Sequence, residues 1–263
     1  MNVMLKVLKY DVRDLVRSRW LLGYAAFFAV VTDALVRFGG SSEKALLSLV
    51  SITLFIVPLV ALVFGTVYLY NAREFTELLL AHPVTRRQLF GGLYLGLTLP
   101  LGLAFVLGVA VPMLLEGLDD AGQRVPFVML LVAGAALTAI FTAVAFLIAT
   151  RTEDRLKGLG IAIAAWLAAA VLYDGLVLVA VLVFGDYPLE RPMLAAMFLN
   201  PLDLARVLLL LQFDASALLG YTGAVFRQFF TGIGGTLVSL TALAAWIAAP
   251  IALGMRAFQR KDF

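Results

Sequence analysis

Two carboxylates stand inside long apolar stretches, where a charge is costly. Asp174 lies within the fifth of six such stretches, and Asp33 lies near the end of the first. An aspartate at the centre of a bilayer costs about 2.5–3.5 kcal/mol on insertion scales. Such a residue usually faces a bundle interior and is a candidate for proton or ion handling. Asp174 therefore has two interpretations, a functional group or a hydrogen-bond partner of a neighbouring Tyr or Thr. Asp33 can simply reach water.

Other reactive residues are few, and their scarcity excludes several classes of site. The chain has no cysteine and a single histidine, His82, so thiolate sites, disulfides, His-rich metal sites and a Ser-His-Asp triad built on several histidines are excluded. No GxxxxGK[ST] phosphate loop is present. Met193 and Met197 stand four residues apart, and thioethers suit Cu(I), but methionine is also a common packing residue. We expect this chain to bind no cofactor of its own, with these methionines as weak metal candidates.

The elements that position these residues are six apolar runs, each long enough to cross a bilayer. Hydrophobic residues make up 63% of the 263 residues and charged residues only 14%, too little polar surface for a globule in water. The runs are continuous, not alternating, so the fold class is all-α, a polytopic membrane protein. The six predicted helices are Trp20–Val36, Ala45–Leu69, Leu89–Leu115, Val125–Ala149, Gly158–Phe184 and Ile233–Met255.

The distribution of positive charge predicts the orientation. Fourteen of the 20 Lys and Arg residues fall before the first run, in the second and fourth connections, or at the C-terminus. The positive-inside rule places these segments in the cytoplasm, so both termini are expected inside and the number of spans is even. Residues 1–19 also show basic and apolar faces at helical spacing. They predict an amphipathic elbow helix at the membrane surface, or only a signal for topology.

The second connection, residues 71–88, is too apolar for a free loop and too charged to span. We expect a short helix whose leucines, Leu78 to Leu80, pack against the underside of the membrane domain. Pro83 ends this helix, because proline disfavours helical geometry at the preceding residue. Thr85 then caps the next helix, with Gln88 at capping-box spacing.

The segment from 185 to 232 is predicted to lie on the extracytoplasmic side as short amphipathic or re-entrant helices. Its stretch around residues 195–211 is apolar, but a seventh span would place charges in lipid and break the even count. Its candidate site residues are Asn200, Pro201, Asp203 and Arg206. We find no internal repeat, so residues 1–263 form one predicted membrane domain.

The second connection, EFTELLLAHPVTRRQLFGGLYLG, resembles the cytoplasmic coupling region of ABC-2 type permeases. The leucine run and the Pro-Val-Thr-Arg-Arg stretch carry the resemblance, while Phe75 replaces the usual glycine before Thr76. The resemblance implies that a separate cytoplasmic ABC ATPase binds ATP and Mg²⁺ and that two copies of this chain form the membrane unit. The residues it marks for coupling to the ATPase are Arg73, Glu74, Thr76, Glu77, Leu78, Pro83, Thr85, Arg86 and Arg87.

Within that family the chain is most similar to the NosY group, which acts in copper-site maturation of nitrous oxide reductase. The stretches that carry this resemblance are RSRWLL, LFIVPLVAL, WLAAAVLYDGLVL and LNPLDLARVLLL. It implies a NosF-like ATPase, a periplasmic NosD-like protein and a bacterial or archaeal inner membrane. It also raises Asp174 to a position shared with the group.

Three other functions stay open at this point. The chain could be an ABC-2 exporter subunit for a lipid, a drug or a peptide. It could instead be an ATP-independent secondary transporter that uses Asp174, although broken helices and repeats, frequent in that class, are not evident. A membrane anchor for an external enzyme is the third. Nucleic acid is not an expected partner, because the basic clusters sit beside membrane runs.

Overall fold

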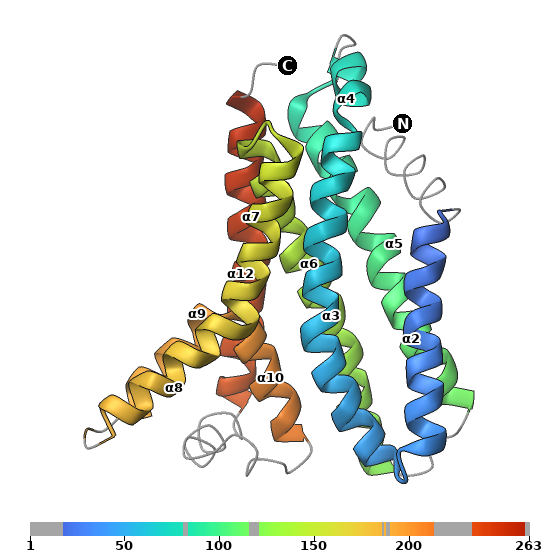
Figure 1. Cartoon of the computed structure of the whole chain (residues 1–263), viewed down its shortest axis with the longest axis vertical. Coiled ribbons are helices and arrows are strands. Elements are labelled where there is room, and N and C mark those ends of the chain that lie inside the picture. The colour runs from blue at the N-terminus through green and yellow to red at the C-terminus, as the bar shows by residue number, and fades with distance from the viewer. Residues whose placement is uncertain are drawn as a thin grey trace.

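The computed structural model describes residues 18–80, 84–115, 121–185, 187, 190–212 and 233–260, and within them the chain is helical (Figure 1). Six helices are long and apolar enough to cross a membrane, which confirms the predicted count. The elements are α2 (Arg19–Phe38), α3 (Ser42–Asn71), α4 (Arg73–Leu80), α5 (Arg86–Leu115), η1 (Ala121–Gln123), α6 (Arg124–Arg151), α7 (Arg155–Leu167), η2 (Ala168–Leu172), α8 (Tyr173–Val183), α9 (Glu190–Leu199), α10 (Pro201–Gln212) and α12 (Ile233–Arg260).

Helix α6 lies at the centre of the bundle and packs against α3, α5 and α12, while α2 packs on α5. Large aromatic side chains fill the interfaces, with Phe28, Phe90, Phe105 and Phe146 fully buried. Lipid is as apolar as leucine, so helices in a bilayer associate through close packing and small residues at contacts. Gly108 is such a contact: a Cβ there would lie 2.7 Å from the carbonyl oxygen of Ala25 and 2.8 Å from the Cβ of Phe28.

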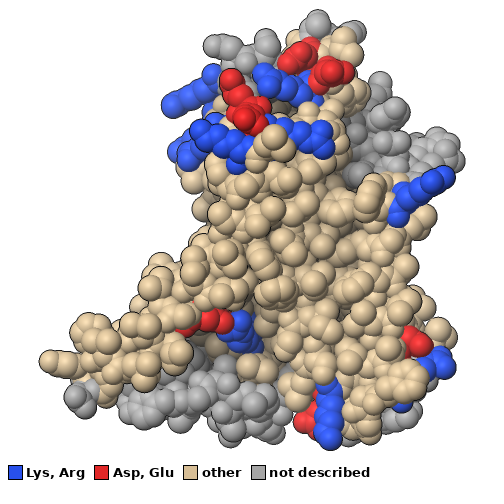
Figure 2. All heavy atoms as spheres, viewed as in Figure 1, with Lys and Arg blue, Asp and Glu red and all other residues tan. Residues whose placement is uncertain are grey.

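One end of the bundle gathers the start of α2, helix α4, the α6–α7 turn and the end of α12 (Figure 1). Figure 2 shows charged side chains concentrated at this end and a broad uncharged zone along the spans. Six spans return the chain to the side where it started, whereas a seventh, formed by the bent pair α9–α10, would not; the predicted cytoplasmic position of both termini stays a prediction. The predicted elbow, apart from its last two residues, lies outside the described residues.

The fifth span differs from the continuous helix predicted for Gly158–Phe184. It runs as α7, then five residues of π-helix in η2, then α8, with the Tyr173 N–H donating to the Ala168 carbonyl. Its most apolar stretch has no buried residue, whereas half or more of the corresponding stretch is buried in α3, α5 and α6. Figure 1 shows α8 leaving the bundle obliquely. A π-turn inserts an extra residue into the helix, which the apolar pattern does not reveal.

Short helices are predicted after the fifth span, and the described residues there, 190–212, form α9 and α10. They meet at Asn200 with a bend of 113°, so they form either a broken span or a re-entrant hairpin. Pro201 begins α10, where its missing N–H costs no helical hydrogen bond. Both helices contribute buried residues to the main core, among them Met193, Met197 and Leu204.

Candidate functional site

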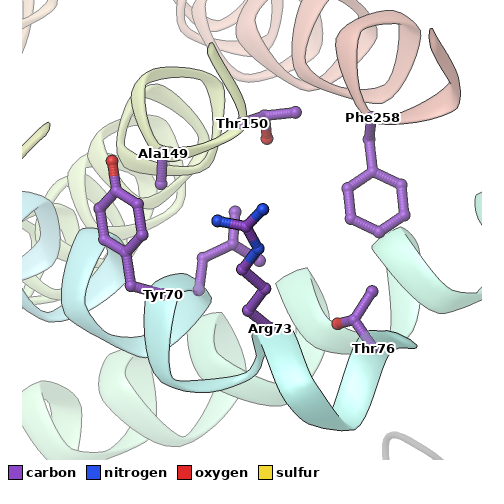
Figure 3. A pocket seen from close by; sticks show the side chains of 7 residues that line it. Tyr70, Arg73, Thr76, Ala149, Thr150 and Phe258 are labelled. Atoms are coloured by element: carbon purple, nitrogen blue, oxygen red, sulfur yellow. The ribbon is translucent and has the colours of Figure 1, made fainter. Parts of the chain in front are cut away.

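The connector between α3 and α5 begins with α4, whose inner face closes the charged end of the bundle. Thr76 is buried, and Arg73 forms an ion pair with Glu77 at 3.4 Å (Nε to Oε1). Figure 3 shows Arg73 and Thr76 beside a small pocket. The lining residues come from four helices: Leu69, Tyr70, Arg73, Thr76, Ala149, Thr150 and Phe258. The start of α4 is therefore seated over the ends of α6 and α12.

The outer face of α4 differs from the expectation that all three leucines pack inward. Leu79 and Leu80 are half-buried against the cluster around Phe90, but Leu78 is 69% exposed. Consecutive residues of an α-helix point about 100° apart, so three leucines in a row cannot share one face. Leu78 instead lies on the outward face with Glu74 and Glu77, which are also exposed.

The second half of the connector starts α5. The predicted cap is confirmed, since the Gln88 N–H donates to Thr85 Oγ1 at 3.4 Å. Arg86 donates from Nη1 to the carbonyl oxygen of Gln259 at 2.8 Å, which ties the start of α5 to the end of α12. Arg87 is exposed, and Pro83 lies outside the described residues.

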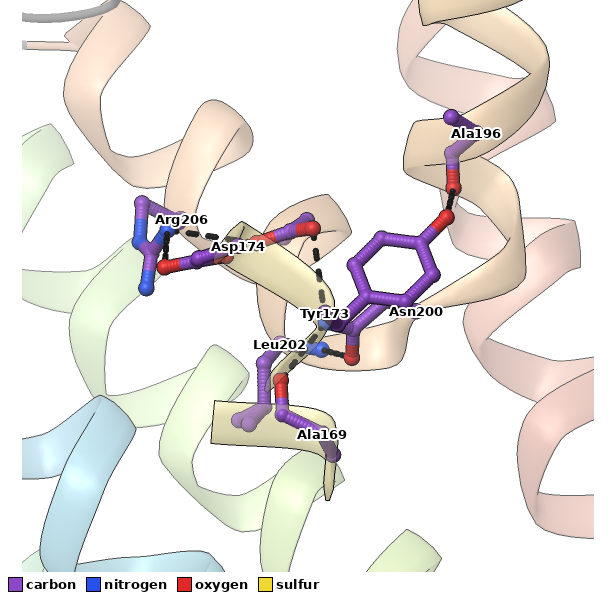
Figure 4. Close-up of polar contacts among 8 residues, drawn as sticks. Ala169, Tyr173, Asp174, Ala196, Asn200, Leu202 and Arg206 are labelled. Atoms are coloured by element: carbon purple, nitrogen blue, oxygen red, sulfur yellow. Dashed lines mark hydrogen bonds and ion pairs between the residues drawn. The ribbon is translucent and has the colours of Figure 1, made fainter. Parts of the chain in front are cut away.

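A polar cluster joins the fifth span to the α9–α10 hairpin. Arg206 donates from Nη1 to Asp174 at 2.7 Å and to Asp203 at 3.2 Å (Figure 4). The side chains of Arg206 and Asp174 are about one-third exposed, and that of Asp203 is 15% exposed. One guanidinium thus faces two carboxylates in a region of low polarity. The partner of Asp174 is an arginine, not the tyrosine or threonine that the sequence suggests.

Asn200 places the apex of the hairpin against the π-turn. Its Nδ2 donates to the Ala169 carbonyl at 2.9 Å and to Asp203 at 3.3 Å, while its Oδ1 accepts from the Leu202 N–H at 3.1 Å. Tyr173 donates its hydroxyl to the Ala196 carbonyl of α9. Asn200 is buried, and both its Nδ2 and its Oδ1 have hydrogen-bond partners, as buried polar groups need.

The other candidates do not join this cluster. Asp33 forms an exposed ion pair with Arg37 at 2.9 Å within α2. Met193 and Met197 are both buried in the hydrophobic core, where their thioethers pack. Among the described residues, no group of three or more His, Cys, Asp or Glu side chains is placed to hold a metal ion.

Sequence comparison identifies the family. The model of the ABC-2 family transporter proteins matches residues 5–263. The chain belongs to the ABC-2 transporter family. Two curated ABC transporter permease proteins are similar over nearly their whole length. The probable ABC transporter permease protein NosY of Pseudomonas aeruginosa is 29% identical, and the protein of the same description from Stutzerimonas stutzeri is 26% identical; each alignment covers 99% of both chains.

Two features of this ABC-2 permease are not predicted by the sequence. The first is the pairing of Asp174 with Arg206, which are 32 residues apart. In the sequence, each of them is an unpaired charge in an apolar segment. The second is Tyr70, at the end of α3, whose hydroxyl reaches the α6–α7 turn 82 residues later. Asp174 has one available signal, its position in an apolar run, but Tyr70 has none.

Proposed function

We propose that this ABC-2 permease couples ATP hydrolysis by a separate cytoplasmic ATPase to movement across the membrane. The observation that carries the proposal is the outward face of α4, where an exposed leucine, Leu78, lies beside two exposed glutamates on a short helix at the basic end of the bundle. On this proposal, Leu78 is an apolar side chain that the ATPase covers, and the two glutamates lie at the edge of the contact. Arg73 and Thr76 line a pocket with residues of α6 and α12, and Leu79 and Leu80 pack against the cluster around Phe90, so force applied to α4 reaches the spans.

The positive-inside rule supports a cytoplasmic position for this end, since most Lys and Arg residues belong to segments that meet there. The opposite end then carries the α9–α10 hairpin on the extracytoplasmic side. The chain itself has no phosphate loop, so we assign ATP and Mg²⁺ to the partner.

The likeness to two proteins described as NosY supports the finer proposal. On this proposal the chain works as a pair with a NosF-like ATPase and a NosD-like periplasmic protein, in the inner membrane, in copper-site maturation of nitrous oxide reductase. The chain would transmit motion without conducting copper. The buried position of Met193 and Met197 supports this, because core thioethers do not offer an open metal path.

Replacing Leu78 with serine tests the docking surface. Burying a leucine in an interface contributes about 1.5–3 kcal/mol, so the variant is expected to bind its ATPase roughly 10- to 100-fold more weakly. The tagged permease is purified in mild detergent, the ATPase that co-purifies is identified by its phosphate loop, and binding is then measured with both proteins purified. Thermal stability should change little, because Leu78 is 69% exposed.

Leu115→Ser is the matched control, because Leu115 is 79% exposed at the last residue of α5, which runs from the α4 end to the opposite end of the bundle. It should leave binding unchanged. If the Leu78 variant binds the ATPase as tightly as the unsubstituted chain, α4 is not the docking surface. A chain that purifies active with no ATPase at all would remove the proposed function.

A pocket favours a second candidate, an ABC-2 exporter of an apolar molecule. The pocket has a volume of about 290 Å³ and lies beside the polar cluster, between α3, η2 and α10. Its walls are mainly apolar, with Ser51 and Arg206 as its polar members. Stimulation of the ATPase by a transported lipid or drug, lost on filling the pocket with Ala170→Phe, would favour this candidate over mechanical signalling. The ATP-independent transporter gains no such support, since the Asp174 carboxylate is held by Arg206.

A further inference from the structure

Tyr70 joins the base of the coupling connector to the turn that starts the fifth span. Its hydroxyl lies 2.7 Å from Thr152 Oγ1, 3.1 Å from the Thr152 carbonyl oxygen and 3.2 Å from the Asp154 carbonyl oxygen. Tyr70 belongs to the last turn of α3, three residues before α4 begins at Arg73. The same tyrosine also lines the pocket that Arg73 and Thr76 face (Figure 3).

The turn that Tyr70 contacts is the N-terminal cap of α7. Thr152 is the C-cap of α6, and the Asp154 side chain accepts from the N–H groups of Leu156 at 2.8 Å and Lys157 at 3.3 Å. Such a cap fixes the first turn of the helix. A displacement of α4 that moves Tyr70 therefore acts directly on the start of α7.

The middle of the same span, at the π-turn and the start of α8, holds the hairpin. Asn200 donates to Ala169 in the π-turn, Asp174 pairs with Arg206 just after it, and Tyr173 donates to Ala196 (Figure 4). These contacts connect the span to α9, to the apex and to α10. The hairpin must therefore shift together with η2 and the start of α8, or all of these hydrogen bonds and the ion pair must break.

Between the two junctions the span is only lightly packed. Gly158 and Ala162 are its buried residues, and Trp166 contacts α3 by donating from Nε1 to the Phe55 carbonyl at 3.1 Å. In α3, α5 and α6, half or more of the most apolar stretch is instead buried. A helix is stiff along its axis because each turn is hydrogen-bonded to the next. Helix α7 is therefore held by polar contacts at its start and at the π-turn that follows it, with Trp166 packed on Phe55 of α3 between them, and it can carry a displacement from one junction to the other.

We infer that α7, η2 and α8 form the element that carries motion from the connector to the hairpin, and that the Tyr70 hydroxyl is the positioning group at its start. This inference rests on the proposed function, since it names the route by which an ATP-driven movement of α4 would cross the bundle. Coupling between distant sites requires an element that both sites bias, and the fifth span contacts both.

Tyr70→Phe tests the inference by removing the hydroxyl and keeping the ring. Gly158→Ala tests it independently, because a Cβ at position 158 would lie 2.1 Å from the Tyr70 hydroxyl oxygen and must displace it from the turn. Tyr94→Phe is the matched control, since that hydroxyl donates to the Ala139 carbonyl at 2.9 Å between α5 and α6, away from the route.

The measurement uses the permease–ATPase complex in lipid nanodiscs. The chain has no cysteine, so spin labels can be placed at Ala195→Cys in the hairpin and Val125→Cys at the start of α6, both exposed positions. The distance between the labels is measured without nucleotide and after trapping with ATP and vanadate. ATPase activity and thermal stability are recorded for each variant.

In Tyr70→Phe and Gly158→Ala we expect ATPase activity to be kept while the ATP-dependent distance change falls below about half of the unsubstituted value, because losing one hydrogen bond shifts a two-position equilibrium by roughly two- to tenfold. Tyr94→Phe should behave like the unsubstituted chain. The inference is overturned if both variants move the hairpin fully, or if ATPase activity falls in parallel with the movement. An unsubstituted complex that shows no ATP-dependent change would instead overturn the proposed function.

Discussion

Arg206→Gln is expected to destabilise the folded protein by about 2–3 kcal/mol. Removing one partner of a fully buried ion pair typically costs about 3–5 kcal/mol, and the partial exposure of this cluster lowers that figure. The substitution leaves Asp174 and Asp203 facing each other without the guanidinium that lies 2.7 and 3.2 Å from them. Thermal unfolding in detergent micelles, followed by circular dichroism, measures the loss.

The double variant Asp174→Asn with Arg206→Gln should lose less stability than the sum of the two single variants, since it removes one charge of each sign. Arg37→Gln is the control. Its Nε lies 2.9 Å from Asp33 Oδ1, one helical turn earlier in an exposed part of α2, so its loss should stay below about 0.5 kcal/mol. Additive losses at Asp174 and Arg206 would show that the pair does not interact in the folded protein.

Gly108→Val is expected to cost at least about 3 kcal/mol or to abolish accumulation of the protein in the membrane. The first added carbon would already lie 2.7 Å from a backbone oxygen of α2, and a backbone cannot rotate away as a side chain can. Overpacking a close-packed contact typically costs about 1–3 kcal/mol when side chains can adjust, and here α2 and α5 must separate. Expression level and thermal unfolding measure the effect.

Gly102→Val provides the comparison within the same helix. No atom lies within 4 Å of a Cβ built at Gly102, so this variant should be neutral or slightly stabilising through helix propensity. Equal losses in the two variants would mean that the effect comes from glycine in the helix and not from the α2–α5 contact.

The six spans are predictable from the sequence because the length of an apolar run is a local property that the bilayer makes necessary. The predicted first, third and fourth spans differ from α2, α5 and α6 by a few residues at their ends. The orientation of Leu78 was also within reach of the sequence, because the 100° step of a helix separates adjacent leucines.

The polar cluster was not predictable in the same way. Asp174 and Arg206 each look costly in an apolar segment, and only the three-dimensional fold brings them to 2.7 Å, where they offset each other. The π-turn at η2 and the reach of Tyr70 to Thr152 depend on packing between segments far apart in the chain. Patterns of apolar residues along the chain carry no information on such contacts.

Because α8 leaves the bundle obliquely, its tilt should depend on the thickness of the bilayer. No residue of α8 is buried by its neighbours in the chain, so lipid tails solvate its leucines and valines wherever no partner covers them. Mismatch between a helix and the hydrocarbon layer costs fractions of a kcal/mol per ångström, and it is relieved most readily by tilting. Lipids with shorter or longer acyl chains should therefore change the inclination of α8, and with it the resting position of the hairpin fastened to its first turn.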